Sequence, residues 1–401
     1  MSVPTAGPAS EAPAGALRRQ HEALEVSGWG ERFVLVQPRN LCFWVYVALT
    51  AVGAVHTFSY YEPTAGFFAE SFAVSAVLCG LCGLAWFLWF RHIDRWERQP
   101  GPLVAAAFVW GGIAGTFAFA LTVNTAMLSL YAKLFGQDWA ANWAAGATAP
   151  FTEEAAKLCG FVLLMGLAPR LVRTANDGLV LGAFIGLGFG VLEDFLYATN
   201  ATWNGFGMDP VRSAVELTAG RIGASFVSHP LFSALVCAGA VYLIGTVAQP
   251  RRVGRGLALV AAGVFLHFTW DDAVGLGFGN AFATLGVALA SVVLGLTALH
   301  LAFRAAAPRE HQLVRDVLAP EVEAGTVTAG ELDEVLDKAA RKASRKSAPD
   351  RRARRARRHL RRAVLDLAHD VAAAGGSDSD DERLAHGRAE VARLRAAART
   401  A

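Results

Sequence analysis

The sequence predicts an all-α polytopic membrane protein with about eight transmembrane helices, a polar pocket between helices four to seven, and a charged helical tail in the cytoplasm. Three observations lead to this fold class. The 401 residues have a positive mean hydropathy of +0.36. Long apolar stretches alternate with short polar connections, and only 18% of the residues are charged. Several of these charges nevertheless lie inside the apolar stretches.

The transmembrane helices follow from a window of about 20 residues, which is the length that crosses a hydrocarbon core of about 30 Å. The predicted helices cover approximately residues 41–60, 66–90, 103–130, 144–167, 178–199, 222–247, 256–278 and 281–303. Only a tight glycine-rich turn separates the last two. Together they define a membrane domain at residues 41–304.

The distribution of Lys and Arg predicts how these helices are oriented, because basic residues near helix ends are retained on the cytoplasmic side. Alternate connections are basic and carry Arg91, Arg95, Arg98, Arg170, Arg173, Arg251, Arg252 and Arg255. The other connections hold only Lys133, Arg212 and Arg221. We therefore expect a multi-pass protein of the plasma membrane with both termini in the cytoplasm.

Two segments flank the membrane domain. Residues 1–40 are rich in Ala, Pro and Gly and lack the apolar core of a signal peptide, which predicts a disordered cytoplasmic lead. Residues 305–401 alternate Ala with charge, which predicts exposed helices. The arginine run from Arg351 to Arg362 is either a solvated helix face or a surface for anionic lipid headgroups, at about 1 kcal/mol per Arg. We expect no nucleic-acid partner, because no aromatic residues are interleaved to stack on bases.

Charged side chains inside the apolar stretches predict the functional site. Each costs roughly 2.5–3.5 kcal/mol to insert at bilayer depth, so we expect them to meet one another, a metal ion or trapped water in one pocket. Glu153 and Lys157 are four residues apart, as are His267 and Asp271, so each pair lies on one helix face. The residues concerned are Glu153, Glu154, Lys157, Glu193, Asp194, His229, His267, Asp271 and Asp272.

Four motifs contain most of these residues. In chain order they are EEAAK at 153–157, GFGVLED at 188–194, HPLFSA at 229–234 and HFTWD at 267–271. This order resembles the PrsW family of intramembrane proteases, which is distantly related to the type II CAAX prenyl endopeptidases. Asp194 stands where many members have Asn. The resemblance covers the membrane domain and implies an endopeptidase that cleaves single-span membrane proteins near the extracytoplasmic face, as in site-1 cleavage of an anti-sigma factor.

The residues also suit peptide hydrolysis on chemical grounds, since that reaction needs an activated water, a base and stabilisation of the oxyanion. Glu153 or Glu154 would be the base, and the spacing to Lys157 favours Glu153. Lys157 would neutralise the paired glutamates, with Asp194 in a supporting role. The expected catalytic residues are Glu153, Glu154, Glu193, His229, His267 and Asp271.

A metal ion is one way to activate that water. His229, His267, Glu193 and Asp271 offer two nitrogens and two carboxylates, a set that zinc accepts while keeping a position open for water. We therefore expect a divalent metal, with Zn²⁺ first. In the alternative mechanism no metal is present, and a carboxylate and the two histidines polarise the water alone.

Two other classes of protein fit intramembrane charge. A proton-coupled transporter would use the carboxylates and histidines as a relay, but it predicts broken helices at matching places in two repeats, and the charge here is confined to helices four to seven. A non-catalytic membrane sensor scaffold is the third interpretation. The complete set of polar groups favours the protease over both.

Overall fold

The computed structural model describes residues 11–94, 96–204, 207–222, 227–375 and 382–400, and every regular element in this part of the chain is a helix. The chain divides into two compact units. One comprises the described residues of Met1–Arg32, Trp96–Arg98 and Ala307–Ala401, and the other those of Phe33–Arg95 and Gln99–Ala306. The unit with Phe33–Arg95 and Gln99–Ala306 contains the apolar helices and is called the membrane unit below.

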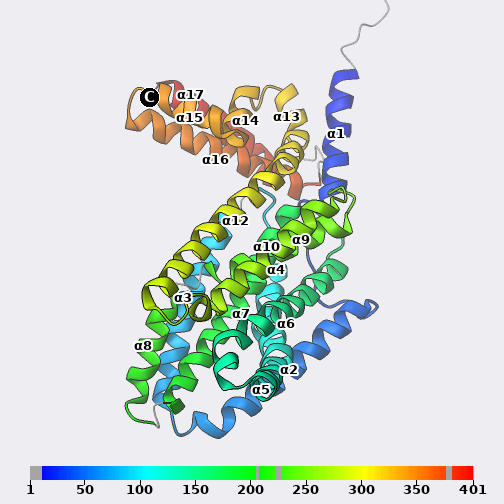
Figure 1. The fold of residues 1–401 in the computed structure, drawn as a ribbon. Coiled ribbons are helices and arrows are strands. Elements are labelled where there is room, and N and C mark those ends of the chain that lie inside the picture. Colours follow the sequence, from blue (N-terminus) through cyan, green and yellow to red (C-terminus); the bar gives the residue numbers. More distant parts are fainter. Residues whose placement is uncertain (1–10, 95, 205–206, 223–226, 376–381, 401) are drawn as a thin grey trace, which may run out of the picture. The chain divides into compact units, whose positions relative to one another are not determined.

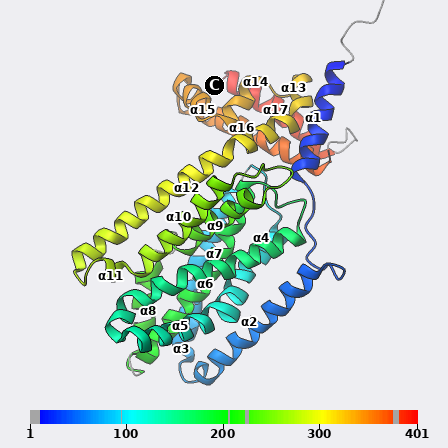
Figure 2. The same cartoon turned by 45° about the vertical axis from the view of Figure 1, so that its right-hand side comes forward.

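The membrane unit is a bundle of helices (Figure 1). Its elements are α2 (Leu41–Ala65), α3 (Ala69–Ile93), α4 (Gly101–Val109), the π-helix η2 (Trp110–Ala120), α5 (Leu121–Phe135), α6 (Gln137–Leu167), α7 (Ala175–Asn204), α8 (Pro210–Ile222), α9 (His229–Ile244), α10 (Val253–Asp271), α11 (Ala273–Leu276) and α12 (Ala281–Val317), whose last residues belong to the other unit. In Figures 1 and 2, α2 and α12 stand at opposite sides of the bundle, with α7 between them.

Six helices of the described part are long and apolar enough to cross a membrane. They are Leu41–Ala65, Ala69–Ile93, Gly101–Phe135, Ala175–Trp203, Val253–Asp271 and Ala281–Val317. The all-helical polytopic fold is thus confirmed, whereas the count of eight spans is not.

The two remaining predicted spans, at 144–167 and 222–247, are not among these six helices. The predicted helix at 144–167 exists as α6, but it carries the paired glutamates and Lys157. Within the predicted helix at 222–247, α8 ends at Ile222 and α9 begins at His229, and residues 223–226 lie outside the described part. Pro230 stands in the first turn of α9, where its fixed backbone angle suits a helix start. The 16 residues of α9 form a short apolar helix.

The glycines of α7 bring α9 into backbone contact. A Cβ atom added to Gly182 would clash with the Ser233 carbonyl oxygen, and one added to Gly186 would clash with the carbonyl of His229. Glycines spaced four residues apart on one helix face thus allow the close approach of the neighbouring helix. On the other face of α7, Gly188 leaves room in the same way for the Phe108 carbonyl. Both contacts hold α7 firmly inside the bundle.

The other compact unit contains α1 (Glu11–Ser27), the end of α12, α13 (Ala319–Glu323), α14 (Ala329–Leu336), α15 (Lys338–Ser347), α16 (Arg351–Ala373) and α17 (Glu382–Thr400). Its buried core includes Leu24, Val317, Leu332, Val364, Leu367 and Val391. The structure differs here from the predicted disordered lead. Residues 11–27 form a helix because its apolar face joins this core, and the Gln20 side chain donates to the Val317 carbonyl at 2.8 Å. Residues 1–10 lie outside the described part.

Candidate functional site

The structure brings the predicted polar residues together from four helices. Glu153, Glu154 and Lys157 come from α6, Glu193 and Asp194 from α7, His229 from α9, and His267 and Asp271 from α10. The charged groups at the centre are almost inaccessible, since Glu153 is 4% exposed and Lys157 is 0% exposed. These polar residues thus form one buried cluster between the four helices.

Three side chains form the centre of this cluster. Glu153, His229 and His267 each offer an atom within 4.8 Å of the other two. The Oε2 atom of Glu153 lies 3.7 Å from His229 Nδ1 and 3.6 Å from His267 Nε2. This oxygen is buried and makes no hydrogen bond within the described part of the chain. It is an unsatisfied acceptor pointing at two imidazoles.

The other oxygen of Glu153 is held in place from α5. Asn124 donates to Glu153 Oε1 at 2.9 Å, and Asn124 itself accepts from the Thr152 hydroxyl at 2.6 Å. Sequence reasoning missed Asn124, because an uncharged amide in an apolar helix carries no strong signal. Its effect is to fix which carboxylate oxygen faces the histidines.

On each histidine, a second carboxylate contacts the ring nitrogen that is not directed at Glu153. Glu193 Oε2 lies 2.8 Å from His229 Nε2, and Glu154 Oε1 lies 3.1 Å from His267 Nδ1. A carboxylate accepts, so each of these ring nitrogens donates its hydrogen. The lone pairs of His229 Nδ1 and His267 Nε2 are then aimed at Glu153. Carboxylates behind ring nitrogens are the usual support of metal-binding histidines.

These positions fit a divalent metal. Zinc bonds to His nitrogen and carboxylate oxygen are about 2.0–2.2 Å long, so neighbouring ligand atoms of a tetrahedral ion lie about 3.3–3.6 Å apart. The two distances from Glu153 Oε2, 3.6 and 3.7 Å, are close to that edge. Two His and one Glu also form a ligand set of catalytic zinc sites. The unsatisfied oxygen and the aimed lone pairs therefore suit a cation.

Lys157 supplies positive charge beside this centre. Its Nζ atom lies 2.7 Å from Glu154 Oε1, 3.5 Å from Glu153 Oε2 and 4.0 Å from the centre of the Phe189 ring. These contacts support the neutralising role expected from the sequence. Nζ also lies 2.9 Å from His229 Nδ1, so the lysine and a metal ion would compete for one lone pair.

The residues expected as metal ligands divide into two groups. His229 and His267 lie in the central cluster, whereas Glu193 contacts the far nitrogen of His229. Asp271 Oδ2 lies 3.4 Å from His267 Nε2, although Asp271 is not a member of the mutually close cluster. The carboxylate that lies with the two histidines in the central cluster is that of Glu153, not that of Glu193 or Asp271.

Two further contacts were not foreseen. The Ser233 hydroxyl donates to Glu154 Oε2 at 3.0 Å, although its place in the HPLFSA motif was a signal. Arg221, which the sequence placed in an outer connection, lies on α8 and pairs with both Glu193 and Asp194. Asp272, by contrast, has a packing role, because it accepts the Gly146 backbone N–H at 2.8 Å and leaves no room for a side chain there.

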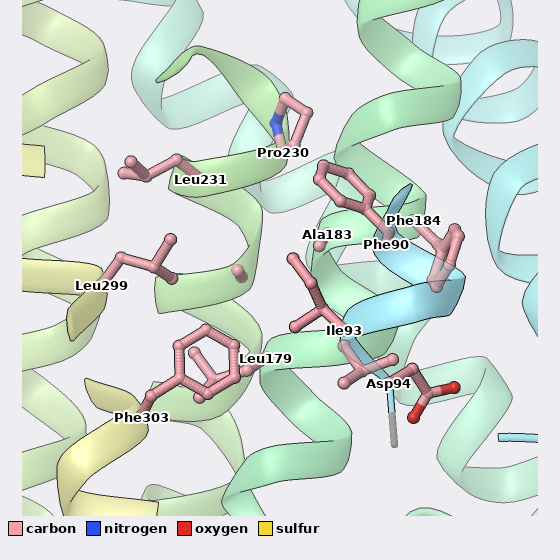
Figure 3. A pocket seen from close by; sticks show the side chains of 12 residues that line it. Phe90, Ile93, Asp94, Leu179, Ala183, Phe184, Pro230, Leu231, Leu299 and Phe303 are labelled. Carbon is pink, nitrogen blue, oxygen red and sulfur yellow. The ribbon is translucent and has the colours of Figure 1, made fainter. Parts of the chain in front are cut away.

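An apolar cavity of about 60 Å³ lies next to α9 (Figure 3). Its lining comes from α3, α7, α9 and α12, and includes Phe90, Leu179, Leu231, Leu299 and Phe303. Apart from Asp94 at one end, no charged side chain lines it. It therefore lacks the groups that hydrolysis needs and is separate from the polar cluster.

The fold and the cluster together define a class, namely polytopic membrane proteins with a buried carboxylate and histidine centre of the hydrolytic type. The comparison with family models then gives the particular family. A model described as PrsW family intramembrane metalloprotease matches residues 99–299, just over half of the chain. The chain belongs to this family, so it is a metal-dependent intramembrane protease. No curated protein and no solved structure matched it.

Proposed function

We propose that this protease cleaves single-span proteins of the plasma membrane near the extracytoplasmic face, in the manner of site-1 cleavage of an anti-sigma factor. The substrate class rests on the four motifs that resemble the family. The side of cleavage rests on the same resemblance, together with the arginine distribution that favours cytoplasmic termini.

The domain organisation supports the proposed orientation. The described residues of Met1–Arg32, Trp96–Arg98 and Ala307–Ala401 belong to one compact unit. A folded unit lies on one side of a membrane, so both flanking segments and the α3–α4 connection share a side. The arginines of that connection then favour the cytoplasm for all three.

The observation that carries the chemistry is the Glu153, His229 and His267 cluster. We assign these three residues to the metal, with Zn²⁺ as the first candidate. A metal bound there would activate a water molecule and polarise the carbonyl of the scissile bond. Glu154 and Glu193 orient the two imidazoles, and Asn124 orients Glu153.

Asp271 is our candidate for the general base. Its side chain is 19% exposed, more than those of the central groups, and its Oδ2 atom makes no hydrogen bond within the described residues. At 3.4 Å from His267 Nε2, this oxygen stands next to the centre and can accept a proton from the attacking water. Glu153 thereby changes from the expected base to a ligand, and Glu193 from a ligand to a support.

The arginine-rich helix α16 supports the second proposed partner, anionic lipid headgroups. Its inner face, with Leu360, Val364 and Leu367, is buried in the core of its unit. The outward arginines are Arg351, Arg352, Arg354, Arg355, Arg358 and Arg362, all exposed. A headgroup surface would attract each by about 1 kcal/mol.

The test is cleavage by the full-length protein reconstituted in liposomes, on a panel of single-span substrates. We expect cleavage that strong chelator abolishes and added Zn²⁺ restores, with about one metal ion per chain in the purified protein. The matched control is Glu153→Gln, which should bind less metal and cleave nothing. Full activity in chelator, with no bound metal, would leave only the metal-free mechanism. Normal cleavage by the Glu153→Gln, His229→Ala and His267→Ala variants would disprove the assigned site.

A further inference from the structure

Arg221 lies beside the site but outside the four motifs. It is near the end of α8, and its side chain is 32% exposed, whereas its two acidic partners on α7 are 14% and 13% exposed. Its Nη2 atom lies 2.8 Å from Glu193 Oε2, and its Nε atom lies 2.5 Å from Asp194 Oδ1. The guanidinium also stacks over the Tyr197 ring at 4.2 Å. One cation thus binds two adjacent carboxylates.

The same oxygen of Glu193 serves two donors. Glu193 Oε2 accepts from Arg221 Nη2 and from His229 Nε2, each at 2.8 Å. A continuous chain of contacts therefore runs from α8 through α7 to the imidazole on α9. The Glu193 contact favours the hydrogen on Nε2, so the other nitrogen of the ring presents a lone pair, which Lys157 Nζ approaches to 2.9 Å.

We propose that Arg221 is a positioning residue of the protease site, which acts through Glu193 to fix the ring orientation and tautomer of His229. The inference rests on the proposed function in so far as His229 Nδ1 is assigned to the metal. Removing the guanidinium would leave Glu193 and Asp194 as neighbouring, largely buried carboxylates. Their repulsion would favour other side-chain positions, and His229 would lose its fixed acceptor.

A fork-shaped guanidinium is needed for this role. Arg presents donors in a rigid plane that can contact two carboxylates at once, whereas Lys is a single point charge. Arg221→Lys should therefore preserve the charge balance and the fold but hold Glu193 less precisely. Arg212 offers a matched control on the same helix, because its pair with Glu216 is exposed and it lies nine positions, about 14 Å along the helix, before Arg221.

The test compares Arg221→Gln, Arg221→Lys and Arg212→Gln in lipid, using ¹⁵N NMR of labelled histidine and titration with Zn²⁺. We expect the His229 signal, assigned with a His229→Gln sample, to show Nε2–H in the wild type and a mixture of tautomers in Arg221→Gln. Zn²⁺ affinity should fall by about 10–100-fold in Arg221→Gln, the usual effect of losing an outer partner of a ligand, and by less in Arg221→Lys. Arg212→Gln should match the wild type in both measurements.

A double-mutant cycle decides whether the effect passes through Glu193. In a Glu193→Gln background, Arg221→Gln should lower Zn²⁺ affinity by much less than it does alone. Fully additive losses, or a wild-type tautomer and affinity in folded Arg221→Lys and Arg221→Gln, would overturn the proposal. The tautomer comparison needs neither metal nor cleavage, so it decides the role of Arg221 even if the wild type binds no Zn²⁺ and the proposed function fails.

Discussion

The substitution Asp271→Asn tests whether Asp271 is the general base of the reaction or a ligand of the metal. The substitution keeps the size and shape of the side chain and removes its ability to take a proton. Asp271 Oδ2 lies 3.4 Å from His267 Nε2, outside the cluster of three mutually close residues. If Asp271 is the base, kcat should fall by about 10²–10⁴-fold, which is the usual contribution of such a group. At about 1.36 kcal/mol per tenfold change, this corresponds to about 2.7–5.4 kcal/mol of transition-state stabilisation.

The bound metal should be unaffected by the same change. Asp271 is not among the three assigned ligands, so the Asp271→Asn protein should bind Zn²⁺ as the wild type does. The fold should also survive, because the substitution removes a largely buried charge without stranding a partner cation. Glu153→Gln is the matched comparison, since it should lose both metal and activity.

The assay is therefore metal content by elemental analysis together with single-turnover cleavage in liposomes. Loss of metal from Asp271→Asn would show that Asp271 is a ligand, as the sequence first suggested. Normal cleavage by that variant would remove it from the chemistry altogether. Metal retained by an inactive Glu153→Gln protein would return the role of base to Glu153.

Three further outcomes are expected. Glu154→Gln should weaken Zn²⁺ binding by about 10–100-fold, measured by titration, because the ring it supports loses a charged acceptor. Gly182→Leu should lower the unfolding temperature in detergent by forcing α7 and α9 apart, whereas Gly286→Leu, where a Cβ meets open space, should not. Burial raises the pKa of Glu331, but hydrogen bonds from Arg395 and Thr328 outweigh it and hold the pKa below its usual value. That stabilisation is present above the usual Glu pKa and is lost as pH falls through the lowered one, so hydrogen exchange in α14 should increase there, and Glu331→Gln should abolish this pH dependence.

The membrane fold could be predicted largely because a hydrocarbon core requires long apolar helices and disfavours unpaired charges. Apolar length identified the long helices, and the cost of buried charge pointed to the polar residues that the structure gathers into one cluster. Helix periodicity could not say which of two adjacent glutamates faces the centre. The structure separates them, since Glu153 Oε2 lies near both imidazoles while Glu154 supports one of them from behind.

The parts that were missed depend on tertiary placement. Arg221 looked like an ordinary residue of an outer connection, and nothing local indicated that α8 would bring it to Glu193. Asn124 is uncharged and lies 29 positions before its partner Glu153. The helix at residues 11–27 forms because the far end of the chain covers its apolar face, which no window of local sequence reports.

The glycine contact between α7 and α9 bears on how the enzyme responds to its bilayer. Where two helices touch through main-chain atoms, their spacing is set by van der Waals contact between the backbones and not by flexible side chains. Glu193 and His229 should therefore travel as one rigid pair when membrane thickness or tilt changes. The outer helices α2 and α12, each with 11% of its apolar window buried, are free to adjust instead. Changes in lipid length would then alter how substrates reach the site while the catalytic geometry stays the same.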